Sequence, residues 1–241
     1  MRPSVLRLLL LAALAGTALT AGPARAQDRV APPLPDTTAG YYGTTGALVL
    51  VLTEYGFGLG GSARVGLTDD VSFVSELSVG AGRDEREQSF IGFFGERTTP
   101  FKRNYVALVP LHFGLERRLF RRSVEDNFRP FVHVGLGPTV AYQWPYFDDA
   151  DDDGRLDGDE AVLGPLADLG SGEARLGVGG ELSVGAFFGR GRTTTQALRF
   201  GVQGMYFPVE VDLLEIRPDV EDPSRHAFWT PVVSFHVARL L

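Results

Sequence analysis

The middle of the chain contains a twelve-residue stretch, residues 149–160, whose residue types and spacing suit the binding of a calcium ion. Ca²⁺ is a hard cation that takes roughly six to eight oxygen ligands, and spaced carboxylates on a tightly turning loop supply them. The expected carboxylate ligands are Asp149, Asp151, Asp153 and Glu160, and Gly154 allows the sharp turn. At position seven of the loop Arg155 offers its backbone carbonyl, and at position nine Asp157 holds a water ligand. The stretch therefore predicts a calcium site.

This stretch resembles an EF-hand loop, but its surroundings differ from those of an EF-hand. The residues before it, 130–146, have the alternation of a strand, and residues 163–170 form at best a short helical turn. A helix-loop-helix sensor is therefore not expected, and we expect weak binding, on the order of 10⁻⁴ to 10⁻³ M as in extracellular modules. The alternative is an acidic, solvated loop whose charges only repel one another.

A second group of charged residues recurs at alternate positions of β-prone segments. If these segments form a closed barrel, the alternate positions face its lumen. The expected lumen charges are Arg64, Glu76, Glu116, Glu173, Arg175, Glu181 and Arg199. An eight-stranded barrel is just wide enough for side chains to fill, so these residues predict a paired network that plugs the lumen. A small-solute channel is the alternative.

Alternation of apolar and polar residues defines the strands that must position these groups. From Ala174 to Phe188 every second residue is apolar or small, whereas the intervening positions include Arg175 and Glu181. A period of two over this length is typical of an extended strand with one apolar face. The pattern resumes from Leu198 after a short turn, which predicts a hairpin.

Eight segments of this kind are expected, and they predict an all-β chain with a single antiparallel sheet. They cover residues 44–53, 57–68, 71–82, 104–117, 130–146, 172–188, 196–212 and 227–241. Alternation alone does not distinguish a soluble sandwich from a membrane barrel, because both have one apolar and one polar face. Loop lengths and aromatic residues must decide.

Three connections on one side of the expected sheet are long, at residues 83–103, 147–171 and 213–226. The connections on the other side, at 69–70, 119–129 and 189–195, are shorter, as in bacterial barrels with outer loops and inner turns. Aromatic residues also gather at the strand ends, where membrane interfaces favour them. The expected outer belt consists of Tyr105, Tyr142, Trp144, Tyr146, Tyr206, Phe207, Phe228 and Trp229, and the inner belt of Phe113, Phe128, Phe188 and Phe200.

The N-terminus has the features of a secretory signal peptide, residues 1–26, with Arg2 and Arg7 before an apolar run and a small-residue cleavage site before Gln27. Residues 27–43 are proline-rich and predict an extended periplasmic tail, so the barrel domain covers 44–241. No later apolar run is long enough for a membrane-spanning helix. The chain has no cysteine and a formal charge of −7. It therefore has no disulfide framework, and nucleic acid is not expected as a partner.

These patterns over residues 44–241 resemble the small bacterial outer-membrane β-barrel proteins of the OmpA, OmpX and OmpW kind. The resemblance implies an eight-stranded antiparallel up-and-down transmembrane barrel in the outer membrane. It also implies contact with membrane lipid, assembly by the outer-membrane machinery and a monomeric state. The expected function is a structural or surface-interaction role, with a Ca²⁺-stabilised outer loop at residues 147–171.

A lipid-modifying enzyme is a third, less favoured alternative. Asp222, Ser224 and His226 have the types of a nucleophilic triad and lie within one expected outer loop. The sequence has no nucleophile elbow and no metalloprotease motif, so we expect no catalysis. His112, His133 and His236 are expected as lumen residues with hydrogen-bond partners.

Overall fold

The computed structural model describes residues 44–91, 97–120, 127–151, 153–157, 160–189, 194–217 and 221–240. The expected signal peptide (1–26) and periplasmic tail (27–43) lie outside the described residues. Within the described ranges, no helix is long and apolar enough to cross a membrane.

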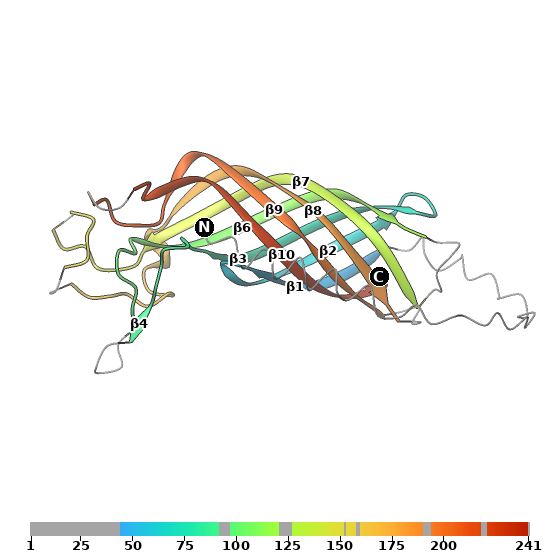
Figure 1. The fold of residues 1–241 in the computed structure, drawn as a ribbon, viewed down its shortest axis with the longest axis horizontal. Helices are drawn as coiled ribbons and strands as arrows, with labels where there is room; N and C mark the ends of the chain where they lie inside the picture. Colours follow the sequence, from blue (N-terminus) through green and yellow to red (C-terminus); the bar gives the residue numbers. More distant parts are fainter. Residues whose placement is uncertain are drawn as a thin grey trace, which may run out of the picture. The chain divides into compact units, whose positions relative to one another are not determined.

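Eight long strands form one closed sheet (Figure 1). They are β1 (Thr45–Thr53), β2 (Gly56–Gly66), β3 (Val71–Gly82), β6 (Asn104–Arg118), β7 (Phe128–Pro145), β8 (Glu173–Phe188), β9 (Thr194–Asp212) and β10 (Ser224–Leu240). Two short strands, β4 (Phe90–Ile91) and β5 (Arg97–Thr98), pair as a hairpin within the loop that follows β3. A 3₁₀ turn, η2 (Leu169–Ser171), precedes β8.

Each long strand pairs antiparallel with its neighbours along the chain, and β1 closes the ring by pairing with β10 from Thr45↔Leu240 to Thr53↔Val232. The prediction of an all-β, eight-stranded, antiparallel up-and-down barrel is therefore confirmed. The expected start of the last strand at residue 227 is wrong by three residues. Ser224 and Arg225 already pair with β9, across a register shift before Ala227, and the outer loop before β10 is shorter than expected.

The two faces of the barrel wall have opposite chemistry, and the apolar face points outward. Leu48, Leu136 and Leu176 are 76%, 68% and 72% exposed, whereas Arg199 and Glu181 on the inner face are 2% and 5% exposed. Side chains alternate between the two faces of a strand, so every long strand has apolar side chains on the outside of the barrel and polar side chains inside. The apolar residues whose alternation predicted the strands therefore lie on the outside of the barrel.

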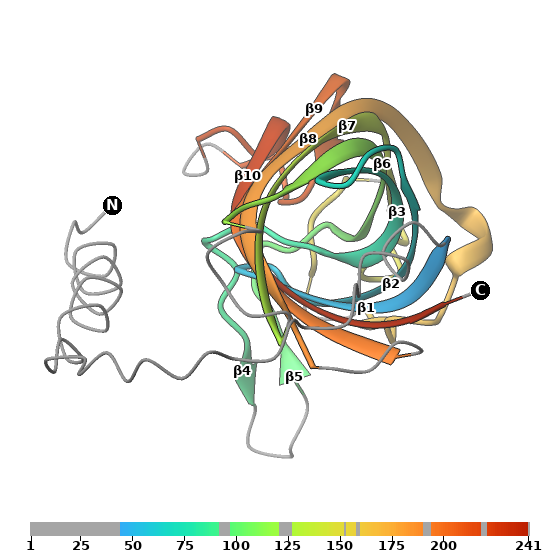
Figure 2. The same ribbon diagram turned by 90° about the vertical axis from the view of Figure 1, so that its right-hand side faces the viewer.

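Buried side chains occupy the interior of the barrel, and Figure 2 shows the ring of strands along its axis. The end of the barrel that has the three long loops is called the outer end. Large apolar side chains from the strands and from the loop after β9 pack there, and Phe207, Leu213 and Phe228 are each 0% exposed. Phe131 and Phe187 pack together at the inner end, with ring centroids 4.7 Å apart. Elsewhere in the interior lie buried polar side chains and a third apolar cluster of Val49, Val51 and Val232.

Glycine allows close packing in this narrow barrel. A Cβ atom on Gly137 would lie 1.9 Å from the carbonyl oxygen of Leu111, which is too close for any side chain. Glycine inside a strand commonly marks such a backbone approach, and here it accounts for part of the chain's high glycine content.

Candidate functional sites

The acidic loop between β7 and β8 begins and ends on a backbone clamp. Phe147 and Val162 form an antiparallel bridge, and the amide of Asp148 donates to the carbonyl of Ala161 at 3.0 Å. The amide of Leu163 donates to the carbonyl of Tyr146 at 2.8 Å. The residues between these bonds therefore leave and re-enter the barrel rim at nearly the same place, which holds the acidic turn above the rim.

Three predicted calcium ligands come together in this turn. Asp149, Asp151 and Asp153 each offer a carboxylate oxygen, and these oxygens lie within 4.8 Å of one another. Asp149 accepts hydrogen bonds from the amides of Asp153 and Gly154, at 3.1 and 2.8 Å. Gly154 has a φ of +73° and so makes the left-handed bend that the sequence predicted for it.

Glu160 closes the turn from the other side. Its Oε1 accepts the amide of Ala150 at 2.8 Å, and its Oε2 accepts the amide of Asp157 at 3.0 Å. Asp157 is exposed and contacts Glu160 through its backbone. The side chain of Arg155 points away from the acids and donates to the carbonyl of Ile216 at 3.3 Å.

The electrostatics of the turn favour a cation. The backbone hydrogen bond from Asp153 lowers the pKa of Asp151, but burial and the neighbouring charges of Asp153, Glu160 and Asp149 outweigh it, and the pKa is raised above its ordinary value. Like charges held this close repel. A carboxylate has about four lone-pair sites, so each acid that accepts one or two amides still has oxygen sites for a metal. The donor set is all oxygen and fits Ca²⁺.

The second predicted group lies in the lumen and is centred on Arg199. Its Nη2 lies 2.6 Å from Oε1 of Glu76, and its Nε lies 3.1 Å from Oε1 of Glu181. The Nε–H itself is directed at Oγ of Ser234, at 3.0 Å. Both glutamates are buried, at 6% and 5% exposure. The structure thus brings three of the predicted lumen charges into one contact group.

Two further pairs complete the predicted set. Arg64 and Glu116 pair at 3.0 Å inside the barrel, where the guanidinium of Arg64 also lies 4.2 Å from the ring centre of Phe187. Glu173 and Arg175 pair with each other at 2.7 Å, but their side chains are 63% and 27% exposed. They stand at the start of β8, near the outer rim and apart from the buried network.

The lumen histidines surround this network. Nδ1 of His112 lies 3.9 Å from Oε2 of Glu181, and Nδ1 of His133 lies 4.0 Å from its Oε1. Nε2 of His236 lies within hydrogen-bond distance of Ser234 Oγ, at 2.9 Å. Each of the three is less than 5% exposed.

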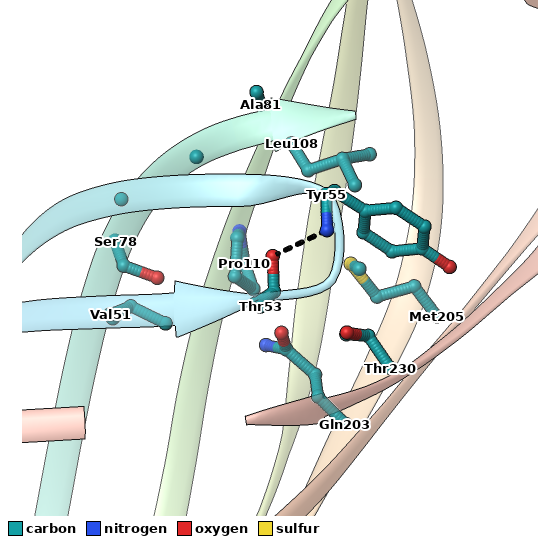
Figure 3. Close-up of a pocket in the computed structure, with 12 residues that line it drawn as sticks. Val51, Thr53, Tyr55, Ser78, Ala81, Leu108, Pro110, Gln203, Met205 and Thr230 are labelled. Atoms are coloured by element: carbon teal, nitrogen blue, oxygen red, sulfur yellow. Dashed lines mark hydrogen bonds between the residues drawn. The ribbon is translucent and has the colours of Figure 1, made fainter. Parts of the chain in front are cut away.

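A small pocket remains inside the barrel behind the β1–β2 turn (Figure 3). Its lining is mostly apolar and includes Tyr55, Leu108 and Met205, with Gln203 and Thr230 at the side. The space open to the centre of a water molecule is about 20 Å³, which is enough for roughly one water. The pocket is therefore a packing gap about the size of one water molecule.

The sequence did not reveal a group of contacts that joins the outer loops. Asp84, in the loop after β3, is 0% exposed and pairs with Arg86 at 2.8 Å and with Arg225 of β10 at 2.9 Å. Burial would raise the pKa of Asp84, but the hydrogen bonds from Arg86 and the charge of Arg225 prevail and lower it. Arg86 also donates to the carbonyl of Asp222 at 2.8 Å.

A second contact, also missed, centres on Glu215, which is 2% exposed although it lies in the loop after β9. Its carboxylate accepts the amide of Leu156 at 3.0 Å, and its own amide donates to the carbonyl of Phe101 at 2.8 Å. Glu215 therefore joins all three long outer loops. Isolated residues on separate loops have no periodicity that would reveal such contacts.

The three residues considered for catalysis lie near the start of β10. Nδ1 of His226 lies 2.9 Å from the carbonyl oxygen of Phe207, and its Nε2 lies 3.3 Å from Oε1 of Glu210. The backbone carbonyl of Asp222 accepts Arg86. These contacts engage His226 and Asp222 with partners outside the considered triad.

No protein-family model and no curated protein sequence matches the chain. Several solved structures are similar. Neisserial surface protein A is 11% identical, with a TM-score of 0.41, 82% of this chain covered and 94% of that one. The N-terminal β-barrel domain of Pseudomonas aeruginosa OprF is 12% identical, with a TM-score of 0.38 and coverages of 82% and 97%. The outer membrane protein OprG from the same organism is 10% identical, with a TM-score of 0.36 and coverages of 83% and 97%. Likeness at this level carries no information about the role of this chain.

Proposed function

We propose that the chain is an integral outer-membrane protein with a structural or surface-interaction role. The observation that carries this proposal is the outward direction of the apolar residues. Leu59, Leu136 and Leu182 lie on three different strands and are 69%, 68% and 66% exposed. A soluble protein rarely exposes contiguous apolar patches beyond a few hundred Å², whereas a membrane barrel turns its apolar set toward lipid.

The filled lumen supports a closed barrel in preference to a channel. Apolar clusters occupy both ends of the interior, and the ion pairs of Arg199 and Arg64 lie between them. A conducting pore needs a continuous polar path, and such paths occur in wider barrels. Planar-bilayer recording of the purified protein should show no stable conductance steps, and reproducible steps would favour the channel.

We further propose that the acidic turn binds Ca²⁺ through Asp149, Asp151, Asp153, Glu160, the carbonyl of Arg155 and a water held by Asp157. The cation would neutralise carboxylates that the fold holds close together. It would thereby order the acidic turn at the outer end of the barrel. The partners in this proposal are outer-membrane lipid and the assembly machinery. The chain would act as a monomer and without catalysis.

The membrane proposal is tested by fractionation of cells that express the full chain. We expect the protein in the outer-membrane fraction, and we expect its gel mobility to change when the sample is boiled, as for a closed barrel that survives in detergent. Recovery of a monomeric protein in detergent-free buffer would contradict the proposal, because exposed apolar side chains on every long strand would then face water.

The calcium proposal is tested by titration of Ca²⁺ into detergent-refolded protein. Amide hydrogen exchange in the acidic turn should slow with Ca²⁺ in the parent and stay unchanged in the Asp149→Ala/Glu160→Ala variant. Mg²⁺ at the same concentration serves as a control for charge screening, because Mg²⁺ demands a tighter octahedral site. Equal protection by both ions, or protection of the variant, would contradict a specific site.

A further inference from the structure

The limb that returns from the acidic turn to β8, residues 163–171, lies against the outside of the barrel. Figure 2 shows the chain just before β8 outside the ring of strands. Three outward aromatic side chains donate hydrogen bonds to its carbonyls. Tyr105 binds Leu163 at 2.9 Å, Trp144 binds Pro165 at 3.1 Å, and Tyr142 binds Leu169. These aromatics also stack on one another, with ring centroids 5.6 Å (Tyr105–Trp144) and 5.8 Å (Tyr142–Trp144) apart.

The composition of this limb suits an apolar environment. It reads LGPLADLGS, with Asp168 as the one charged residue. The carbonyls of three of its residues are directed at the aromatic side chains, whereas Leu166 is 83% exposed and Leu169 is 39% exposed. The limb therefore satisfies backbone polar groups against the wall and presents leucine side chains to the surroundings.

The limb also lies next to the apolar wall along the chain. Tyr142 pairs with Ala174, and Val140 pairs with Leu176, in the adjoining strands β7 and β8. Leu176 and Val178 are 72% and 63% exposed on the outer face. Going outward along β8, the large exposed apolar side chains end at Leu176, and beyond Ala174 and Gly172 the leucines of the limb follow.

We propose that residues 163–171 dock on the membrane, with Leu166 and Leu169 at the boundary between the headgroups and acyl chains of the outer leaflet. The inference rests on the proposed membrane function. Tyr and Trp mark this boundary in membrane proteins, and the limb is bound to three of them. An apolar segment bound to the wall at that height meets lipid before it meets any soluble partner. Docking would also hold the acidic turn close to the headgroups.

Spin labelling tests the inference, because the chain has no cysteine. Single variants Leu166→Cys, Leu136→Cys and Ile216→Cys are labelled with a nitroxide and reconstituted into vesicles of phosphatidylcholine and phosphatidylglycerol. All three side chains are exposed, at 83%, 68% and 62%, so labels should not disturb folding. Oxygen, which concentrates in lipid, and a water-soluble nickel chelate then report the depth of each label.

We expect lipid-like oxygen collision at Leu136, water-like nickel collision at Ile216, and intermediate depth at Leu166 with several-fold less nickel collision than at Ile216. Leu136 in lipid together with Leu166 as open to nickel as Ile216 would overturn the docking inference alone. A Leu166 label shielded from both reagents would indicate a protein contact and would also overturn it. A nickel-accessible Leu136 would overturn the membrane function itself, and the docking inference with it.

Discussion

Replacement of Arg199 tests whether the lumen is a dry, packed network. Arg199→Met keeps an extended side chain but removes the charge that faces Glu76 at 2.6 Å and Glu181 at 3.1 Å, and it removes the hydrogen bond to Ser234. Both carboxylates would remain buried without their partner. Removal of one member of a buried ion pair typically costs about 3–5 kcal/mol, and two pairs share this arginine, so we expect a loss at the upper part of that range.

A matched variant separates the loss of the ion-pair attraction from the cost of leaving buried carboxylates without a partner. Arg199→Met/Glu76→Gln/Glu181→Gln leaves no ionised carboxylate opposite the missing arginine. Because most of the cost comes from the uncompensated buried charge, we expect this triple variant to recover most of the stability that the single variant loses. The free energy of unfolding is measured by guanidinium titration in detergent micelles, with the folded fraction read from gel mobility without boiling.

A water-filled lumen predicts a different result. Water would solvate Glu76 and Glu181, the single variant would lose less than about 1 kcal/mol as for an exposed pair, and the triple variant would bring no recovery. That outcome would refute the packed network, and it would restore the channel as the better interpretation.

Three other predictions follow from the geometry. Gly137→Ala should destabilise the barrel by about 1–3 kcal/mol or prevent its assembly, because the new Cβ would overlap a backbone carbonyl. The control is Gly164→Ala, whose Cβ would meet nothing within 4 Å, and it should leave the unfolding midpoint unchanged. The lowered pKa of Asp84 means that its contacts stabilise the fold above the unfolded value of about 3.9 and are lost as the pH falls through the lower folded value. Hydrogen exchange at the amide of Arg86, which Asp84 accepts, should stay slow at pH 5 after correction for the intrinsic rate, and Asp84→Asn should accelerate it at that pH. Gly154→Ala, at a φ of +73°, should weaken Ca²⁺ binding in calorimetric titration by about 1–2 kcal/mol, and an unchanged affinity would mean that this bend is not needed.

The strands could be predicted because their chemistry repeats. Leu176, Val178 and Leu182 alternate with polar or small residues, and one face of a strand determines the other. The same periodicity identifies a face but not a height along the barrel axis. It therefore assigned Arg175 and Glu173 to the lumen together with Glu181, although the structure places these two near the rim, where their side chains are 27% and 63% exposed.

The contacts of the outer end could not be predicted, because they depend on where loops meet in space. Asp84 and Arg225 are far apart in sequence and lie in segments without periodicity, so nothing marks them as partners. The aromatic belt was expected to face lipid headgroups. For Tyr146, Phe207 and Phe228 this expectation is wrong, because they are buried at 3%, 0% and 0% exposure. Tyr105, Tyr142 and Trp144 direct their polar groups at the backbone of residues 163–171, which alternation within β6 and β7 does not foretell.

These loop contacts bear directly on the proposed surface role. An acidic turn on a freely moving loop would lose conformational entropy whenever it bound a cation or a partner, and that loss weakens binding. Here the turn is clamped at its base by the Phe147–Val162 bridge, and its second half is held by Glu215 through the amide of Leu156. Its far limb is bound to the aromatic wall. The carboxylates of Asp149, Asp151 and Asp153 therefore remain close together although they repel, which a solvated, extended loop would not do. Such preorganisation is the reason to expect a binding surface at this end of the barrel.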